Sequence, residues 1–330
     1  MDENDVALID AIHVNPRATF EQLGTALGMS ASTAARRWRA LEDSGEVWVS
    51  SVPGPALVLT GAAVRIDCDT ADLHQVTEAL VDLPQVASLQ VTTGDYALYA
   101  LVVTSDRDAL ASLILDGIGQ IPGIRRLSTA VMVRLFGGRQ WNLGALDPAQ
   151  RAEVKGRTLS PPARRSGAEV DEADRALFLA LQYDGRMGFR ELGEHLDLSE
   201  KAAKRRLEKL VQDDRIAFRA DFVRSAAGWP FQIVLWLAVP PRELRMLTHA
   251  LVGIPQSRVC AEVVSSANVF VTFQMHRVEE LPVIEERIAA ASPGARVLER
   301  LTVLRSVKSW GRVLGPDGRA VRVVPVDMWA

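Results

Sequence analysis

The feature that most constrains this chain is an internal repeat. Residues 5–47 align without a gap on residues 174–216, and 14 of the 43 positions are identical. Unrelated segments of this length would share about two or three residues by chance, and a repeat of this size is typical of a duplicated structural unit. We therefore expect two copies of one design in a single chain.

Apolar spacing predicts three short helices in the repeated unit. Leu8 and Ile12 lie one helical turn apart and suit the buried face of a first helix, and Phe20, Leu23 and Leu27 mark a second. Polar breaks, expected to form turns, contain Arg17 in copy one and Arg186 in copy two. Ser30 and Ser199 each precede a third helix, where a serine hydroxyl can accept a hydrogen bond from a free backbone N–H.

The third helix has one apolar face and one face rich in cations and hydroxyls. Its apolar face carries Ala34, Trp38 and Leu41, or Ala203, Leu207 and Leu210 in copy two. The opposite faces carry Ser32, Thr33, Arg36 and Arg39 in copy one, and Lys201, Lys204, Arg205 and Glu208 in copy two. This pattern predicts a helix-turn-helix whose last helix enters the major groove of double-stranded DNA. The alternatives are a basic face that is merely solvated and a three-helix bundle used for dimerisation.

Composition limits the other possibilities. The formal net charge is −3, so any nucleic-acid contact must come from local basic patches. Cys68 and Cys260 lie in apolar surroundings without a His or Cys neighbour at metal-ligand spacing, and we expect two buried free thiols and no metal or cofactor. An acidic start argues against a secretory signal, and no apolar run is long enough to span a membrane. These features predict a soluble, cytoplasmic protein without membrane contact.

The two repeats are followed by similar strand and helix patterns in the order β-α-β-β-α-β, which is typical of ferredoxin-like domains. Residues 47–52 read as a wing strand and Pro53-Gly54-Pro55 as a hinge. We therefore predict an α+β protein with two winged helix-turn-helix domains and two ferredoxin-like domains in tandem. The expected boundaries are helix-turn-helix 1 at 1–52, ferredoxin-like domain 1 at 56–136, a linker at 137–170, helix-turn-helix 2 at 171–224, ferredoxin-like domain 2 at 228–310 and a tail at 311–330.

These motifs together resemble the leucine-responsive regulatory protein/AsnC (Lrp/AsnC) family of transcription regulators, in a tandem-duplicated form. The resemblance rests on the helix-turn-helix pattern around Arg17, Ser30, Arg37 and Leu41, and on Thr93-Gly94-x-Tyr96 in the following domain. In this family the second domain, also called the RAM domain, mediates oligomerisation and senses small effectors, often amino acids.

The resemblance implies specific site residues. It adds Arg37 and Arg206 to the residues expected near DNA, so that the full set is Ser32, Thr33, Arg36, Arg37, Arg39, Lys201, Lys204, Arg205 and Arg206. It places an effector at the turn of Thr93, Gly94, Asp95 and Tyr96. The chain departs from the family at Ala97, where an acid is common, and the corresponding turn of copy two lacks both the glycine and the aromatic residue.

The expected partners follow from the resemblance: double-stranded DNA, an amino-acid effector, and a homodimer or higher homo-oligomer. The duplication, with its two different recognition faces, predicts an operator with two unlike halves. The two ferredoxin-like sheets can cover each other within one chain or between two chains. A siroheme decarboxylase uses the same pair of domains, and the third strand here only partly matches the strand seen in those enzymes. The main prediction is a DNA-binding regulator without enzymatic activity. The second alternative to it is a small-molecule sensor that does not bind DNA.

Overall fold

The computed structural model describes residues 1–137, 141, 143–155 and 170–330, which divide into two compact units. The first, here named the helix-turn-helix unit, comprises residues 1–58, 142–222 and 319–326. The second, the barrel unit, comprises residues 59–141, 223–318 and 327–330. Segments of the same kind are therefore grouped together, although they alternate along the sequence.

Each copy of the repeat in the helix-turn-helix unit folds into three helices, as predicted. The helices are α1 (Glu3–Val14), α2 (Phe20–Leu27) and α3 (Ala31–Asp43) in copy one, and α7 (Glu172–Tyr183), α8 (Phe189–His195) and α9 (Glu200–Gln212) in copy two. Ser30 accepts a hydrogen bond from the Thr33 amide (3.1 Å), and Ser199 accepts one from the Ala202 amide (3.2 Å). Both predicted serine caps are thus confirmed.

Two positions of the repeat require a left-handed backbone in both copies. Gly28 has φ of 66°, and the equivalent Asp197 has φ of 53°. Gly45 has φ of 71°, and the equivalent Asp214 has φ of 54°. Aspartate tolerates this conformation better than most non-glycine residues, so the turn geometry is kept where the glycine is not.

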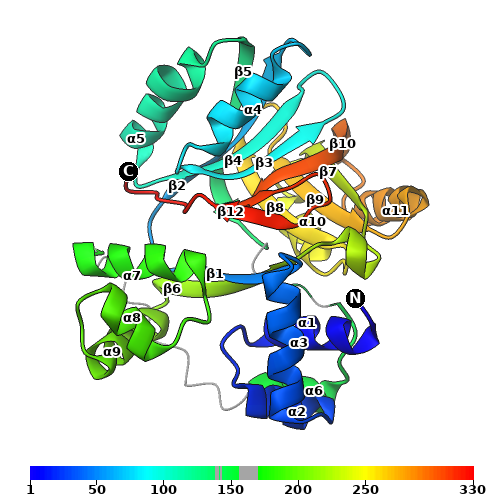
Figure 1. Ribbon diagram of the computed structural model, residues 1–330. Coiled ribbons are helices and arrows are strands. Elements are labelled where there is room, and N and C mark those ends of the chain that lie inside the picture. Colours follow the sequence, from blue (N-terminus) through cyan, green and yellow to red (C-terminus); the bar gives the residue numbers. More distant parts are fainter. Residues whose placement is uncertain (138–140, 142, 156–169) are drawn as a thin grey trace. The chain divides into compact units, whose positions relative to one another are not determined.

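The predicted wing strand forms, but its partner lies in the other copy. Strand β1 (Val47–Pro53) pairs in antiparallel fashion with β6 (Ile216–Phe222), with Val49 opposite Ala220 (Figure 1). The residue after β1, Gly54, continues this contact by donating its amide to the Arg215 carbonyl (2.8 Å). The segment expected to be a hinge is therefore held against the second copy.

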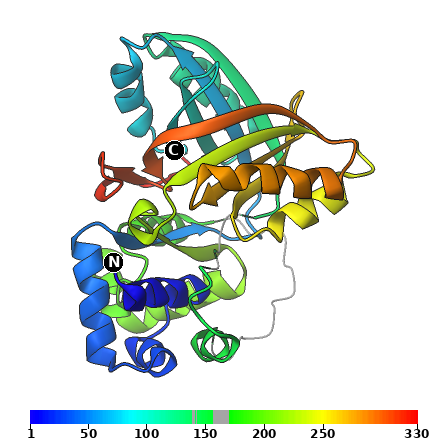
Figure 2. The ribbon, with the colours of Figure 1, turned by 90° about the vertical axis from the view of Figure 1, so that its right-hand side faces the viewer.

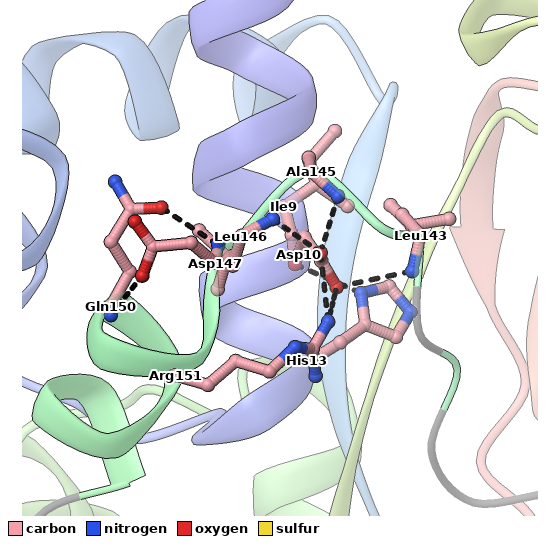
Figure 3. Close-up of polar contacts among 9 residues, drawn as sticks. All are labelled: Ile9, Asp10, His13, Leu143, Ala145, Leu146, Asp147, Gln150 and Arg151. Atoms are coloured by element: carbon pink, nitrogen blue, oxygen red, sulfur yellow. Dashed lines mark hydrogen bonds and ion pairs between the residues drawn. The ribbon is translucent and has the colours of Figure 1, made fainter.

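The expected linker contains a helix that packs on the first helix-turn-helix. Helix α6 (Pro148–Lys155) is preceded by a loop whose amides bind the buried carboxylate of Asp10 (Figure 3). Asp10 accepts hydrogen bonds from the backbone amides of Leu143 (3.1 Å), Ala145 (2.9 Å) and Leu146 (3.2 Å). Arg151 of α6 adds an ion pair with the same carboxylate at 2.9 Å.

Copy two has Leu179 at the position of Asp10, so only copy one has this anchor. The rest of the expected linker, 156–169, lies outside the described residues.

The barrel unit contains both predicted ferredoxin-like segments. Copy one supplies β2 (Thr60–Cys68), α4 (Leu73–Val81), β3 (Val86–Thr92), β4 (Leu98–Thr104), α5 (Arg107–Ser112) and β5 (Ile124–Leu135). Copy two supplies β7 (Phe231–Ala238), α10 (Leu244–Val252), β8 (Ser257–Val264), β9 (Val269–Met275), α11 (Leu281–Ala291) and β10 (Arg296–Ser309). Two short strands of the tail follow, β11 (Arg312–Leu314) in this unit and β12 (Ala320–Val323) in the helix-turn-helix unit.

The two four-stranded sheets join edge to edge within one chain. The strand order β10-β3-β4-β2-β5-β8-β9-β7 closes on itself because β7 also pairs with β10. The junctions between the copies are β3 with β10 and β5 with β8, both antiparallel. Figure 2 shows the orange β10 running beside the yellow-green β7, with α11 along their outer side. Closure leaves no free edge among these strands.

The closed sheet has an inner and an outer apolar layer. The inner layer mixes side chains from both copies, including Tyr99, Trp236, Phe270 and Leu301. The outer layer of copy two packs β7 and β9 against α10 and α11. Cys68 and Cys260 are both buried free thiols, as expected, and burial raises the pKa of Cys260 to about 12. No helix in the described part of the chain is long and apolar enough to cross a membrane.

Candidate nucleic-acid interface and effector turn

The recognition helix of copy one, α3, presents a polar face to solvent. Ser32, Arg36 and Arg39 are exposed, and Thr33 is half-buried. The hydroxyls of Ser32 and Thr33 lie 2.9 and 2.8 Å from the hydroxyl of the cap residue Ser30. The helix therefore starts with a small hydroxyl cluster and continues with two cations, which suits contacts to phosphates and base edges.

The recognition helix of copy two, α9, has a different polar face. Lys201, Lys204 and Arg205 are exposed. Lys204 lies 4.0 Å from Glu208 one turn later, a weak pair on an open helix surface. The acid at Glu208 stands where copy one has Arg39, so the two helices differ in charge at this exposed position.

The two arginines added from the family resemblance are engaged inside their own bundles. Arg37 of α3 binds Asp2 (2.9 Å) and Asp5 (2.7 Å) at the start of α1. Arg206 of α9 repeats this arrangement with Asp171 and Asp174 at the start of α7. The hydrogen bonds to Asp5 and Asp2 raise the pKa of Arg37. The pKa of Asp2 is lowered by the hydrogen bond from the Asp5 backbone amide and then by that from Arg37, so both groups are held in their charged forms.

Three arginine pairs are identical between the copies, and only one of them lacks a structural explanation. Arg37 and Arg206 tie the third helix of each bundle to the first. Arg17 and Arg186 donate to backbone carbonyls. Arg36 and Arg205 are exposed and have no ion pair or hydrogen bond among the residues described. An exposed arginine that occurs in both copies and has no ion-pair or hydrogen-bond partner among the described residues is a good candidate for contact with another molecule.

The predicted effector turn connects β3 and β4 and rests on a strand of copy two. Thr93 donates its amide to the Thr302 carbonyl (2.9 Å) and accepts the Thr302 amide at its hydroxyl (3.0 Å). Gly94 has φ of 95°, and a Cβ there would lie 2.8 Å from Leu301 Cδ2. The positive φ therefore favours glycine, and a larger residue would also have to displace the end of the Leu301 side chain.

The remaining turn residues lie beside two guanidinium groups. The ring of Tyr96 is contacted by Arg65 at 4.9 Å and by Arg126 at 4.6 Å. Asp95 is exposed, and its carbonyl accepts a long hydrogen bond from Arg126 (3.4 Å). The turn thus combines an exposed carboxylate, an exposed guanidinium and an aromatic ring, which are groups suited to the ammonium, carboxylate and side chain of an amino acid.

A polar cluster that the sequence patterns did not predict lies next to this turn. Arg65 binds Glu299 (2.5 Å) and the Ser128 hydroxyl (2.8 Å), and its guanidinium stacks on Trp236 at 4.6 Å. Arg65 lies opposite Tyr99 in the β2–β4 pair, and Trp236 lies opposite Phe270 in the β7–β9 pair. Arg65 and Trp236 therefore occupy equivalent positions in the two copies. The duplication has therefore put a cation in one copy and its aromatic partner in the other. The sequence gives one hint of this cluster, which is that Arg65 lies directly between the apolar residues Val64 and Ile66 of the strand.

The corresponding turn of copy two is built differently. The side chain of Asn268 accepts the Val239 amide and donates to the Val239 carbonyl, both at 2.8 Å. Ala267 is buried in the inner layer. The Asn268 side-chain amide is already bonded to the Val239 backbone, and the turn contains no aromatic residue. It therefore offers no set of groups comparable to that of the first turn.

The histidines do not gather into a site. His13 donates to the Ile9 carbonyl (2.9 Å) and His276 to the Gly228 carbonyl (2.7 Å). His74, His195 and His249 are exposed on α4, α8 and α10. Among the described residues, no group of three or more His, Cys, Asp or Glu side chains has the arrangement of a metal site.

Comparisons with known proteins match both helix-turn-helix copies and the first ferredoxin-like segment. A family model for the AsnC-type helix-turn-helix domain matches residues 1–42 and 170–211, and one for the Lrp/AsnC ligand binding domain matches residues 61–138. The HTH-type transcriptional regulator LrpA of Pyrococcus abyssi is 27% identical over 140 residues, which cover 40% of this chain and 96% of LrpA. FL11, an HTH-type transcriptional regulator of Pyrococcus horikoshii, is 25% identical over 137 residues, covering 41% of this chain and 90% of FL11.

One solved structure shares the fold of almost the whole chain. The siroheme decarboxylase NirDL aligns with a TM-score of 0.58 at 14% identity and covers 93% of each chain. At this identity the likeness concerns the fold alone.

Proposed function

Because the chain belongs to the Lrp/AsnC family and carries the family's helix-turn-helix domain twice, we propose that it is a sequence-specific DNA-binding transcriptional regulator. The observation that carries the proposal is the pair Arg36 and Arg205. Each is repeated, exposed and without an internal partner in the described structure. Ser32, Thr33, Arg39, Lys201 and Lys204 complete the proposed contact surface.

In this proposal Arg37 and Arg206 act indirectly. Their ion pairs with the aspartates at the start of the first helix hold the recognition helix in place. A DNA phosphate would have to compete with two carboxylates for each guanidinium, so we assign them a positioning role.

The DNA proposal predicts a defect in Arg36→Ala and Lys204→Ala. Each variant should bind a duplex selected by the wild-type protein roughly tenfold more weakly, and each lost phosphate contact should lower the slope of log affinity against log salt by about 1. Fluorescence anisotropy across a salt series measures both quantities. The matched control is Arg107→Ala, which removes an equally exposed cation from α5 in the barrel unit.

Absence of selective DNA binding by the wild-type protein at low salt would contradict the proposal. The next experiment would then be an absorbance titration with an iron porphyrin, because the decarboxylase fold is the alternative. We propose that the chain has no enzymatic role, since its histidines are either bonded to backbone carbonyls or exposed on separate helices.

We further propose that an amino acid is the effector and binds at Thr93, Gly94, Asp95 and Tyr96, with Arg126 beside them. Asp95 would hold the ammonium group, Arg126 the carboxylate, and Tyr96 would contact the side chain. Because the free edges of both sheets are already paired within one chain, association into homodimers or larger homo-oligomers would have to use other surfaces.

The effector proposal predicts that a subset of amino acids raises the melting temperature. A ligand present at 100 times its Kd stabilises a protein by about 2.7 kcal/mol, which is readily detected. Asp95→Asn should weaken the binding of that amino acid about tenfold or more in calorimetry, because a charge-assisted bond is lost. Asp108→Asn, an equally exposed aspartate on α5, is the control. Equal binding by both variants, or no shift with any amino acid, would refute this site.

A further inference from the structure

Two equivalent arginines cross between the helix-turn-helix copies. Arg17 donates Nη1 to the Gly185 carbonyl (2.6 Å) and Nη2 to the Met187 carbonyl (2.9 Å) of copy two. Arg186 donates Nη1 to the Pro16 carbonyl (2.6 Å) and Nη2 to the Ala18 carbonyl (2.7 Å) of copy one. Each guanidinium therefore bridges the two carbonyls that flank the other arginine's position in the opposite turn.

Aromatic side chains complete both crossings. The guanidinium of Arg17 lies 5.4 Å from the ring of Phe189 and 5.3 Å from that of Phe218. The guanidinium of Arg186 lies 4.8 Å from Phe20 and 5.8 Å from Trp38. Phe189 and Phe20 begin α8 and α2, and Trp38 lies on the recognition helix α3. Arg186 therefore contacts both helices that follow the turn in copy one, and Arg17 contacts helix α8 and strand β6 in copy two.

Both crossings are forked hydrogen bonds from a charged, largely enclosed guanidinium. Forked donation by a guanidinium to two acceptors is geometrically specific, and hydrogen bonds from a charged donor are stronger than neutral ones. Burial lowers the pKa of Arg17 to about 10, with a further contribution from nearby Arg186, so the group stays charged at neutral pH. Gly185 also donates its amide to the Val49 carbonyl (2.9 Å), which links the same turn to the β1–β6 ribbon.

We propose that Arg17 and Arg186 determine operator geometry: by clamping the two copies together, they fix the separation and orientation of α3 and α9, so that one chain reads two unlike half-sites at a single spacing. This inference rests on the proposed DNA-binding function. It assigns a role to turn residues that do not themselves lie on the recognition faces. It also explains why the arginine is repeated in both copies, since each copy must clamp the other.

The test uses a duplex selected by the full-length wild-type chain and variants of that duplex with 1 to 10 base pairs inserted between the half-sites. Insertion of about half a helical turn rotates one half-site to the opposite side of the duplex. Wild type should therefore lose about 100-fold in affinity, because one recognition helix no longer reaches its site. In the Arg17→Ala/Arg186→Ala variant, affinity for the selected duplex should fall about tenfold because the two heads are no longer preorganised. Its preference between spacings should shrink to roughly threefold, while binding to a single half-site stays at the wild-type level.

Two further variants separate the clamp from general stability. Arg17→Lys keeps the charge but cannot donate as a fork, so it should also relax the spacing preference. Arg190→Ala removes a neighbouring exposed cation on α8 and should leave the preference intact. The double alanine variant must retain wild-type circular dichroism, and if it does not, Arg17→Lys and Arg186→Lys provide the comparison. A folded clamp variant that keeps the wild-type spacing preference would overturn the inference. Failure of the wild-type chain to select any duplex would instead reject the underlying DNA-binding proposal.

Discussion

Asp10→Ala is expected to destabilise the helix-turn-helix unit by about 3 kcal/mol. The Asp10 carboxylate is fully buried and accepts three backbone amides from the loop before α6. It also binds Arg151 at 2.9 Å. Removal of the carboxylate leaves these donors without an acceptor, and hydrogen bonds to a charged group are individually among the stronger ones in proteins. Urea unfolding followed by circular dichroism measures the change in free energy of unfolding.

A second readout tests the anchor itself. If Asp10 holds the loop and α6 on α1, the variant should be cleaved by a protease within residues 143–155 at concentrations that leave wild type intact. Asp43→Ala, which removes an exposed carboxylate at the end of α3, should change stability by less than about 0.5 kcal/mol. Equal unfolding midpoints for Asp10→Ala and Asp43→Ala would show that the anchor contributes nothing.

Gly54→Ala is expected to cost about 3 kcal/mol, because the added methyl group has no space. A Cβ at Gly54 would lie 1.9 Å from the Asp214 carbonyl oxygen and 2.4 Å from its carbon. Both are backbone atoms of copy two and cannot move as a flexible side chain could. The hydrogen bond from the Gly54 amide to the Arg215 carbonyl (2.8 Å) must then break or shift. Thermal unfolding should show a clear loss of stability.

Gly188→Ala is the matched control for this prediction. Gly188 precedes α8, has a negative φ of −68°, and no atom lies within 4 Å of the position its Cβ would take. Alanine should therefore be tolerated there with little change. Similar melting temperatures for the two variants would contradict the close packing of Gly54 on copy two.

The repeat allowed most local structure to be predicted. Apolar spacing and the serine caps gave the six helices of the two bundles, and strand patterns gave the order β-α-β-β-α-β in both copies. These features depend on residues a few positions apart, and their physical causes are local: capping, helical periodicity and strand alternation. The family resemblance came from the same local motifs and was confirmed by the family comparisons.

The candidate site was only partly accessible from the sequence. Exposure of Arg36 and Arg205 follows from helical periodicity, and the structure agrees. Helical periodicity left Arg37 and Arg206 off the outer face, but their ion pairs join residues more than 30 positions apart, so the sequence could not identify their partners. The same holds for Arg65, whose partner Glu299 lies 234 positions away.

The repeat and the residue patterns were enough to predict two copies of one design, the helices and strands of each copy, and the residues that face solvent on the recognition helices. How the copies combine depends on three-dimensional packing: β1 pairs with β6, both sheets close into one barrel, and Arg17 and Arg186 cross between the bundles. A strand edge can pair with any compatible edge, and an arginine can bind any exposed carbonyl. Such partners are selected by the packing of the whole chain rather than by local sequence.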